Sequence, residues 1–210
     1  MKLHTSSVAP NPRRVAIFLG EKGIEVPTVE IDLAAQQNFD PDFVALNPLA
    51  RVPVLELDDG TCIAESVAIC RYFEEEQPEP VLFGTGSAGK AIVEMWNRRM
   101  EFEVVGNISY AFRHGHPYWE GRIEQVPDFA DLCKRTIEER MVWLDSELKD
   151  REYIAGDAYS IADITAICGF DLGRVAKIRI PDNLSNLSRW YATVAARPAV
   201  AATVPSRKKK

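Results

Sequence analysis

The first third of the chain alternates short apolar runs with turn residues, which predicts a small mixed domain. Lys2 to Thr5 predicts a first strand, and Asn11-Pro12 predicts a helix start, with asparagine as N-cap and proline at the first helical position. Gly23 suits the C-terminal cap of this helix, and Val26 to Ile31 predicts a second strand. The apolar face of the helix is formed by Val15, Ala16, Phe18 and Leu19. Because one short helical connection joins the two predicted strands, we expect them to form a parallel pair with a right-handed crossover.

A short helix, a hairpin and a further helix follow in the pattern. Phe39 to Leu46 predicts the short helix, which Asn47-Pro48 ends. Val52 to Leu57 and Thr61 to Ala64 predict two paired strands, joined by a two-residue turn at Asp59-Gly60. Glu65-Ser66 then begins a helix that carries apolar residues as far as Phe73.

The pattern changes after a polar connector rich in proline and glycine, which includes Gln77-Pro78-Glu79-Pro80 and Gly84-Thr85-Gly86-Ser87. Beyond it, helical periodicity dominates and no clear strand signal occurs. The predicted helices cover residues 90–112, 129–150, 161–177 and 184–196. We therefore expect an α/β domain at 1–80, a linker at 81–88 and an all-helical domain at 89–210.

One of these helices has a well-defined predicted start. Ser160 is a favoured N-cap, and Asp163 at the third helical position can return a hydrogen bond to the Ser160 backbone N–H. The pair predicts a capping box, whose first role is structural.

Composition narrows the classes of function. The chain has 210 residues, 46% of them hydrophobic and 27% charged, which is typical of a globular protein with a sizeable core. Its net charge of -6 argues against nucleic-acid binding, and the basic run Arg207-Lys208-Lys209-Lys210 predicts a frayed, solvated end. No apolar run approaches the roughly 20 residues of a membrane span, and no secretory signal precedes the first strand. The four cysteines form no CxxC and no zinc spacing, so we expect structural thiols, no metal and a cytoplasmic location.

The hairpin carries the candidate chemistry. Proline cannot donate to a ladder, so Pro53 sits at an edge, a first position or a bend, and a cis Val52–Pro53 bond would free the Val52 backbone to pair with an extended ligand. Glu65 and Ser66 place a carboxylate, a hydroxyl and free backbone N–H groups together at a helix start, where they can hold both the ammonium and the carboxylate of an amino acid. The alternative is an ordinary hairpin, an edge proline and a helix cap.

The segments VPVL, DDG and ESVAICRYF resemble the glutathione-binding half of the glutathione S-transferase family, and the SIAD start at Ser160 resembles the capping motif of its helical domain. The resemblance covers the whole chain. It implies a thioredoxin-like domain followed by an all-helical one, a homodimer, and glutathione as co-substrate without a bound cofactor. It also implies that Val52 before cis-Pro53 pairs with the cysteinyl part of glutathione, and that Glu65 and Ser66 hold the γ-glutamyl end. Arg51 falls where it can meet the glutathione backbone or glycyl carboxylate, or lie in solvent.

The residue that activates the thiol is the point where the sequence departs from the family. Ala9 stands at the usual serine or cysteine position and His4 stands where many relatives have an aromatic residue, so the chain resembles an atypical bacterial and fungal branch without the usual Tyr, Ser or Cys. A hydrogen-bond donor or a helix N-terminus can lower a thiol pKa from about 8.5 into the neutral range. The alternatives within the first domain are Ser6, Ser7, Asn11 and the helix terminus itself.

The second domain offers further helpers for the thiol. In the resembling branch, a water held by Ser and His of the helical domain is implicated, and Ser109, His114 and His116 are the plausible counterparts. Each also has a structural alternative, since a histidine suits a helix C-terminus. Tyr110, Phe112 and Trp119 can line an apolar pocket or belong to the core.

Three functions follow from this sequence. The first is transfer of glutathione to small hydrophobic electrophiles, with a role in detoxification. The second is glutathione-dependent peroxide or disulfide reduction, which needs the same thiolate. The third is a non-catalytic glutathione-transferase-like binding module, which Ala9 favours and the retained Pro53, Glu65 and Ser66 oppose.

Overall fold

A computed structural model of the chain describes residues 1–204 and divides it into two compact units. The first unit contains Met1–Val81 and the chain from Pro198 onward, and the second contains Leu82–Arg197. The basic run from Arg207 lies outside the described residues.

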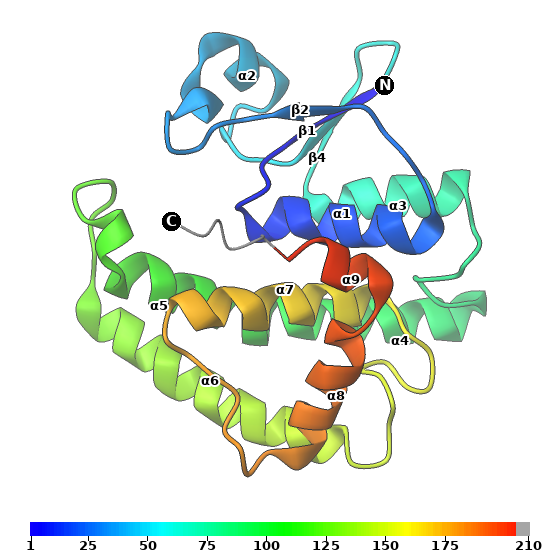
Figure 1. The fold of residues 1–210 in the computed structure, drawn as a ribbon, viewed down its shortest axis with the longest axis vertical. Helices are drawn as coiled ribbons and strands as arrows, with labels where there is room; N and C mark the ends of the chain where they lie inside the picture. The colour runs from blue at the N-terminus through cyan, green and yellow to red at the C-terminus, as the bar shows by residue number, and fades with distance from the viewer. Residues whose placement is uncertain (205–210) are drawn as a thin grey trace. The chain divides into compact units, whose positions relative to one another are not determined.

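The first unit is built on a four-stranded mixed sheet (Figure 1). Its strands are β1 (Lys2–Thr5), β2 (Thr28–Glu30), β3 (Val54–Glu56) and β4 (Cys62–Ala64), in the order β2-β1-β3-β4. β1 pairs with β2 in parallel and with β3 antiparallel, in the register Thr5↔Glu30 and His4↔Val54. The expected parallel pair and hairpin are therefore confirmed.

Helices cover both faces of this sheet. α1 (Pro10–Lys22) and α3 (Ser66–Glu76) pack together on one face, and α2 (Pro41–Leu46), preceded by the short helix η1 (Gln37–Phe39), lies on the other (Figure 1). The α2 side has its own core, in which Phe43 packs with Val52 and Val54. Because side chains alternate along a strand, the neighbouring Leu55 faces the α1 side and is fully buried.

Two local predictions in this unit are wrong in detail. The first helix begins at Pro10 with Ala9 as N-cap, so Asn11 is not the cap. Proline at position 10 suits the first helical position as well as Pro12 does, and the Ala9 N–H is already bound by the Ser6 carbonyl. The hairpin turn contains three residues, because Leu57 pairs with Thr61 and Gly60 at φ 86° takes the left-handed position.

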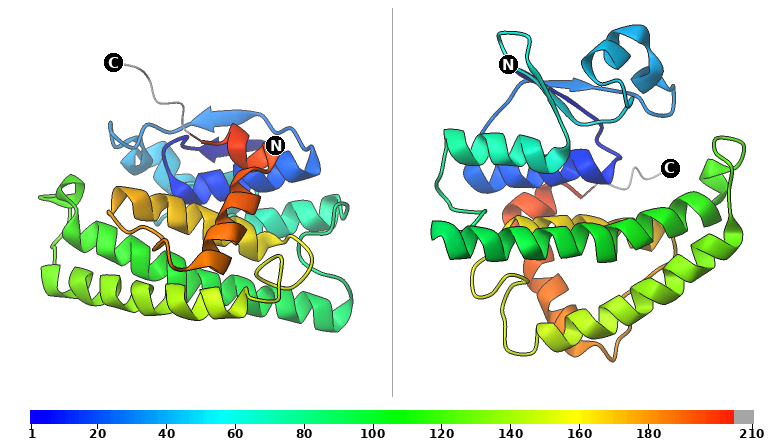
Figure 2. Two further views of the ribbon diagram at one scale, coloured as in Figure 1. Left: turned by 60° about the horizontal axis from the view of Figure 1, so that its bottom comes forward. Right: turned by 180° about the vertical axis from the view of Figure 1, so that it is seen from behind.

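The second unit is helical, as expected. Its elements are α4 (Gly86–Arg99), η2 (Met100–Gly106), α5 (Asn107–Gly115), η3 (Pro117–Trp119), α6 (Pro127–Glu147), α7 (Ile161–Val175) and α8 (Ser185–Ala195). α4, η2 and α5 form one long rod that runs beside α6, and α7 packs against the rod (Figure 2). The expected helix of residues 90–112 therefore extends further at both ends.

The middle of the rod is a π-helix, which sequence periodicity did not predict. Its seven residues follow the backbone pattern of a wider helix, and α7 approaches it closely. A Cβ on Gly169 of α7 would lie 2.7 Å from the Val105 side chain, so only glycine permits this contact. The widening rotates the faces of α5 relative to those of α4.

The predicted capping box of α7 is confirmed. Ser160 is the N-cap, its hydroxyl accepts from the Ala162 N–H, and Asp163 accepts from the Ser160 N–H at 3.0 Å. Asp163 is fully buried and also accepts from the Ile154 N–H and the Trp190 indole N–H. The box therefore joins three segments of the second unit.

The end of the chain returns to the first unit, whereas the sequence placed it in the helical domain. α9 (Pro198–Ala202) packs on α1, where Ala199 lies against Gly20 and the Arg13 Nε donates to the Thr203 hydroxyl at 3.1 Å. Because α9 has only five residues, its sequence pattern is too short to predict that it packs on α1.

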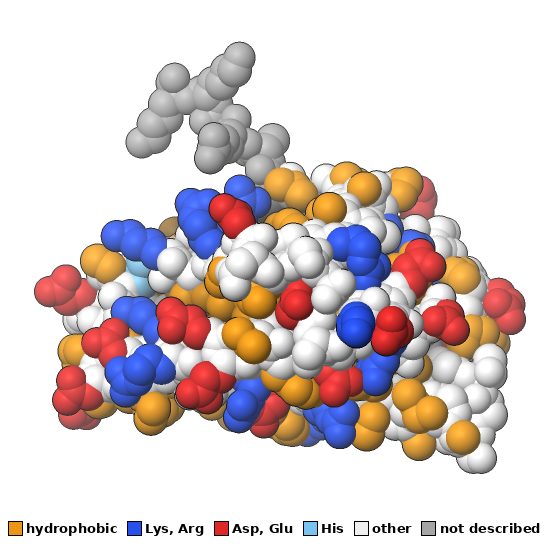
Figure 3. Space-filling view, turned by 90° about the horizontal axis from the view of Figure 1, so that it is seen from below, with side chains coloured by type: hydrophobic (Ala, Val, Ile, Leu, Met, Phe, Trp, Pro, Cys, Tyr) orange, Lys and Arg blue, Asp and Glu red, His pale blue; other side chains and the backbone are white. Residues whose placement is uncertain are grey.

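The surface carries both signs of charge. The face shown in Figure 3 has Lys and Arg side chains interspersed with Asp and Glu, with apolar side chains between them. Among residues 1–204, no helix is both long enough and apolar enough to span a bilayer.

Candidate functional site

Val52 lies just before β3 and keeps its main chain free. The ladder between β1 and β3 begins at the pair His4↔Val54, so Val52 is outside it. Within the described chain, neither the N–H nor the C=O of Val52 has a hydrogen-bond partner, although the residue is only 9% exposed. The Val52–Pro53 bond is cis, as the sequence analysis expected. A buried backbone donor and acceptor without partners provide pairing groups for an extended ligand.

Two asparagines shape the turn that leads to Val52. The Asn38 amide donates to the Ala50 carbonyl at 2.9 Å, and the Asn47 amide donates to the Arg51 carbonyl at 2.8 Å. Ala50 has φ 52°, which needs such support in a non-glycine residue. The Arg51 side chain is exposed. From the sequence, Asn47 is predicted only as a helix end, because these bonds depend on the folded turn.

The start of α3 combines an acid, a buried hydroxyl and a buried cation. Glu65 is the exposed N-cap residue, with φ 68°, and Ser66 is 3% exposed. An Arg14 guanidinium N–H donates to the Ser66 Oγ at 2.8 Å, and Arg14 is itself 3% exposed. Since Arg14 donates, the hydroxyl proton of Ser66 remains available for an acceptor. A guanidinium behind a helix N-terminus reinforces the attraction of that terminus for anions.

Arg14 is a site residue that sequence reasoning missed. It occupies the buried stripe of α1 together with Ile17 and Phe18, so a cation falls on an apolar helical face. That mismatch was a detectable signal. Its partner was not predictable, because Ser66 is 52 residues away in the sequence.

The loop before α1 uses Ser7 as an anchor. Both the backbone N–H and the hydroxyl of Ser7 donate to the Glu30 carboxylate, at 2.8 and 3.0 Å. β2 carries Glu30, and it lies on the opposite side of β1 from β3. In this arrangement, the Ser7 hydroxyl proton is directed toward Glu30.

The first turn of α1 has one free backbone donor. The Ala9 N–H binds the Ser6 carbonyl, Pro10 and Pro12 have no N–H, and the Arg13 N–H binds the Ala9 carbonyl. The Asn11 N–H is the remaining donor, and it has no bonded partner within residues 1–204. The partial positive charge of the helix N-terminus is therefore presented through Asn11.

The candidate residues of the second unit lie along α5. Ser109 is partly buried, and it is about 140° around the helix axis from His114, five residues later. The Val126 N–H donates to the His114 Nδ1 at 3.2 Å, and the Tyr118 N–H donates to the His116 Nδ1 at 3.1 Å. Each histidine therefore has a structural contact through one ring nitrogen.

The aromatic residues expected near this helix form a cluster. The Phe112 ring contacts the rings of Tyr118 and Trp119, at centroid distances of 6.2 and 6.0 Å, and Tyr110 contacts Phe129 at 5.6 Å. The guanidinium of Arg113 lies over the Trp119 ring. None of these four side chains is buried, and Tyr110 and Tyr118 are 48% and 42% exposed, so they form a surface cluster and not part of the core.

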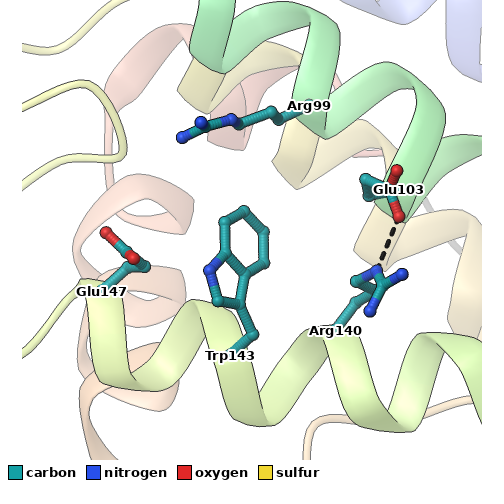
Figure 4. A pocket seen from close by; sticks show the side chains of 5 residues that line it. All are labelled: Arg99, Glu103, Arg140, Trp143 and Glu147. Carbon is teal, nitrogen blue, oxygen red and sulfur yellow. Dashed lines mark hydrogen bonds and ion pairs between the residues drawn. The ribbon is translucent and has the colours of Figure 1, made fainter.

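A pocket of about 350 Å³ opens between the rod and α6 in the second unit (Figure 4). It is lined by Arg99, Glu103, Arg140, Trp143 and Glu147. Arg140 is paired with Glu103 at 2.6 Å, and Glu147 is paired with Arg151 at 2.8 Å. Because these charges are compensated within the protein, the pocket offers little net attraction for an ion. It contains none of the residues that the sequence analysis selected.

Residues 1–204 contain no group of three or more His, Cys, Asp or Glu side chains placed to hold a metal ion. Burial raises the pKa of the Cys133 thiol, and burial together with the nearby Glu56 carboxylate raises that of Cys62. Neither of these two thiols is therefore activated as a nucleophile.

Comparison with known protein families gives two matches. Residues 8–76 match the model of the glutathione S-transferase N-terminal domain, and residues 109–198 match that of the C-terminal domain. The first match contains Val52, Pro53, Glu65 and Ser66, and the second contains Ser109 and His114.

Individual proteins resemble the whole chain. Glutathione S-transferase 2 of Saccharomyces cerevisiae is 34% identical, over 100% of this chain and 91% of that protein. The crystal structure of Gtt2 from Saccharomyces cerevisiae, also 34% identical, superposes with a TM-score of 0.92 and covers 97% of this chain and 100% of the other. A relative of another kind, Elongation factor 1-gamma 2 of Oryza sativa, is 25% identical over 93% of this chain and 46% of its own length. The structural match confirms the thioredoxin-like domain followed by a helical one.

Proposed function

Because the chain belongs to the glutathione S-transferase family, we propose that it binds glutathione and transfers it to small hydrophobic electrophiles. The observation that carries this proposal is the unpaired backbone of Val52 beside the charged start of α3. In the proposed complex, the cysteinyl part of glutathione adds to Val52 as an extra strand. Pro53 and Arg51 flank this pairing position.

Glu65 and Ser66 receive the amino-acid head of glutathione. The carboxylate of Glu65 binds the ammonium, and the hydroxyl and N–H of Ser66 bind the carboxylate. Arg14 supports this role, because its guanidinium fixes the Ser66 oxygen and leaves the hydroxyl proton for the ligand. The γ-glutamyl end of glutathione carries an ammonium and a carboxylate on one carbon, so this pair of residues can bind both groups together.

The thiol of glutathione is activated by hydrogen bonding at the start of α1. One bond to a charged group contributes about 1.5–3 kcal/mol, and one pKa unit corresponds to about 1.36 kcal/mol, so a single donor lowers a thiol pKa by about one to two units. From about 8.5, this makes the thiolate a major species at neutral pH. The Asn11 N–H is the donor that the first unit offers.

The other candidate donors have lesser or complementary roles. The Ser7 hydroxyl becomes available only if it leaves Glu30, which makes it a weaker candidate than Asn11. Ser109 and His114 of α5 keep the helper role that the family resemblance assigns, with the His114 Nε2 as the group left for it. No bound cofactor is required, because glutathione itself supplies the nucleophile.

Measurement of glutathione binding tests this proposal. Glutathione at millimolar concentration should raise the melting temperature by linkage, and Glu65→Gln or Ser66→Ala should remove that rise. Ser87→Ala is the matched control, because Ser87 is an exposed serine in the first turn of another helix. Absence of saturable binding by the unmodified protein would refute the proposal.

The two remaining functions are tested by different measurements: the reductase by turnover, and the binding module by the thiol pKa of bound glutathione. Peroxide or disulfide reduction uses the same thiolate, so activity confined to an organic hydroperoxide, with none toward a chloronitrobenzene, would favour that reaction. Elongation factor 1-gamma 2 matches this chain over only 46% of its own length, so a domain of this kind also occurs as one part of a longer protein, as the binding-module function supposes. An unshifted thiol pKa of bound glutathione, followed by thiolate absorbance, would favour the module.

A homodimer in the cytoplasm completes the proposal. Large apolar side chains are exposed along the rod and on α6 of the second unit, namely Ile92, Met95, Phe102, Leu132 and Val142. We propose that some of these exposed apolar side chains pack against another copy of the chain. Light scattering should give twice the monomer mass, and Phe102→Glu should reduce it.

A further inference from the structure

The π-helix η2 in the middle of the rod is followed by Asn107, whose side chain bonds back into it (Figure 2). The Asn107 side-chain amide donates to the Glu103 carbonyl at 2.9 Å and to the Phe102 carbonyl at 3.4 Å. The backbone N–H of the same residue bonds to the Val104 carbonyl. In a regular α-helix, this N–H would bond to the carbonyl four residues earlier, which is that of Glu103. The side chain therefore occupies the acceptor that an α-helical register would use.

Two glycines make room for the wider helix. A Cβ on Gly106 would lie 3.2 Å from the Glu101 carbonyl oxygen, five residues earlier, and a Cβ on Gly169 of α7 would lie 2.7 Å from the Val105 side chain. A glycine removes a steric clash but forms no bond through a side chain, so it permits the π-helix without favouring it over an α-helix. Asn107 favours it, because its amide supplies donors to carbonyls of the widened turn.

The register of η2 determines which way the side chains of α5 point. A helix turns by about 100° per residue, so a change of register by one residue would rotate every later side chain by about that angle. With η2 in its π-helical form, Ile108 and Ala111 are buried, whereas Ser109 and His114 are only partly buried. The orientation of Ser109, two residues after Asn107, therefore depends on the hydrogen bonds that Asn107 makes.

We propose that Asn107 is a positioning residue, whose side-chain bonds hold η2 in its π-helical form and so orient Ser109 and His114 for the transfer reaction. This role rests on the proposed function, in which these two residues of α5 help to activate the thiol. Asn107 acts only through the orientation of α5, and the residues proposed to bind glutathione lie in the other unit. Its loss should therefore lower kcat and leave the KM for glutathione unchanged.

Three substitutions separate hydrogen-bond donation from the shape of the side chain. Asn107→Ala removes the amide, and Asn107→Asp keeps its shape but cannot donate when ionised. Both should lower kcat for glutathione and a chloronitrobenzene about threefold to tenfold, as expected for the loss of a hydrogen bond. Asn107→Ser should retain most of kcat, because a serine hydroxyl can donate to the carbonyl four residues earlier, here that of Glu103.

Asn183→Ala is the matched control, because Asn183 is an exposed asparagine of the same unit. Its kcat and KM should equal those of the unmodified protein. The contacts of α5 with α6 and α7 remain in all these variants, so each should fold, which a cooperative thermal transition verifies. Equal kcat in the unmodified protein, N107A and N107D would overturn the proposal, and so would a decrease in N107S as large as that in N107A.

Crystal structures of N107A and N107S test the orientation of α5 without reference to turnover. In N107A, residues 100–106 should lose the π-helical bonds, and the Ser109 side chain should be turned or occupy several orientations, whereas N107S should keep the π-helix. A π-helix and a single Ser109 orientation that both persist in N107A would overturn the proposal. If the unmodified protein transfers no glutathione, the proposed function fails and the catalytic part of this role fails with it. The two structures then decide whether Asn107 sets the orientation of α5.

Discussion

Arg14 shows how a single residue connects folding to the proposed ligand site. It is buried in the apolar stripe of α1 and donates to the Ser66 hydroxyl. Burial of a cation is unfavourable unless hydrogen bonds compensate it, so its position is explained by what it holds. We expect that the head group of glutathione is bound tightly only while this bond is present.

Arg14→Met should therefore weaken glutathione binding. A hydrogen bond to a charged group is worth about 1.5–3 kcal/mol, which corresponds to a loss of affinity of roughly 10-fold to 100-fold. Calorimetric titration measures it. Arg13→Met is the matched control, because Arg13 bonds to Thr203 and should leave the affinity unchanged. Equal affinity in all three proteins would show that Arg14 does not support the site.

At this scale, sequence predicted the residues that lie in local motifs. Val52, Pro53, Glu65 and Ser66 are within 15 positions of one another, and the hairpin and helix start that hold them are formed by local turn and capping preferences. The role of Arg14 was not predicted, because Ser66 lies 52 residues away and is brought to it only by the tertiary fold. The bond from Asn47 to the Arg51 carbonyl spans only four residues, but it depends on the conformation of the turn that precedes Val52. The roles of all these residues in glutathione binding stay a prediction.

At the scale of elements, capping and periodicity predicted which helices occur better than they predicted where each helix begins. The start of α7 was predicted correctly because Ser160 and Asp163 act over three residues. The π-helix in the rod was not predicted, because apolar spacing does not distinguish it from an α-helix and the close contact at Gly169 is tertiary. The start of α1 was predicted two residues too late, because Pro10 and Pro12 both suit the first helical position.

Asp163 makes the stability of α7 depend on pH. Burial is the main cause that raises its pKa to about 6, while hydrogen bonds from Ile154, Trp190 and Ser160 lower it. A raised pKa in the folded state means that folding binds a proton, so this contribution is complete below about pH 4 and is lost as the pH rises through 6. Two pKa units correspond to roughly 3 kcal/mol.

Urea unfolding of the unmodified protein and Asp163→Asn from pH 4 to pH 7 checks this effect. The variant is expected to be less stable, because its amide presents donors to three donor groups. The stability difference between the two proteins should shrink by up to about 3 kcal/mol as the pH rises to 7. A difference that stays constant or grows would contradict the assigned direction.

At the scale of the whole molecule, Lys22 secures the point where the chain leaves the first unit. Its fully buried ammonium pairs with Glu74 at 2.8 Å and binds the carbonyls of Gln77, Pro78 and Pro80. The sequence predicted a connector here from its prolines, but a lysine in α1 gave no sign of such a role. The packing of α9 on α1 was also not predicted, because it depends on long-range contacts, as the role of Lys22 does.

Lys22→Met should destabilise the protein by about 3–5 kcal/mol, the usual effect of breaking a buried ion pair from one side. Denaturation by guanidinium measures the change, with exposed Lys90→Met as control. A loss no greater than that of the control would mean that the junction does not depend on Lys22.

The most direct test of the whole account is the exchange of the Val52 amide proton with and without glutathione. If glutathione adds as a strand at this residue, the Val52 N–H becomes protected and its NMR signal shifts on titration, and Ser66→Ala requires more glutathione for the same change. A Val52 signal that neither shifts nor gains protection at saturating glutathione would contradict the account.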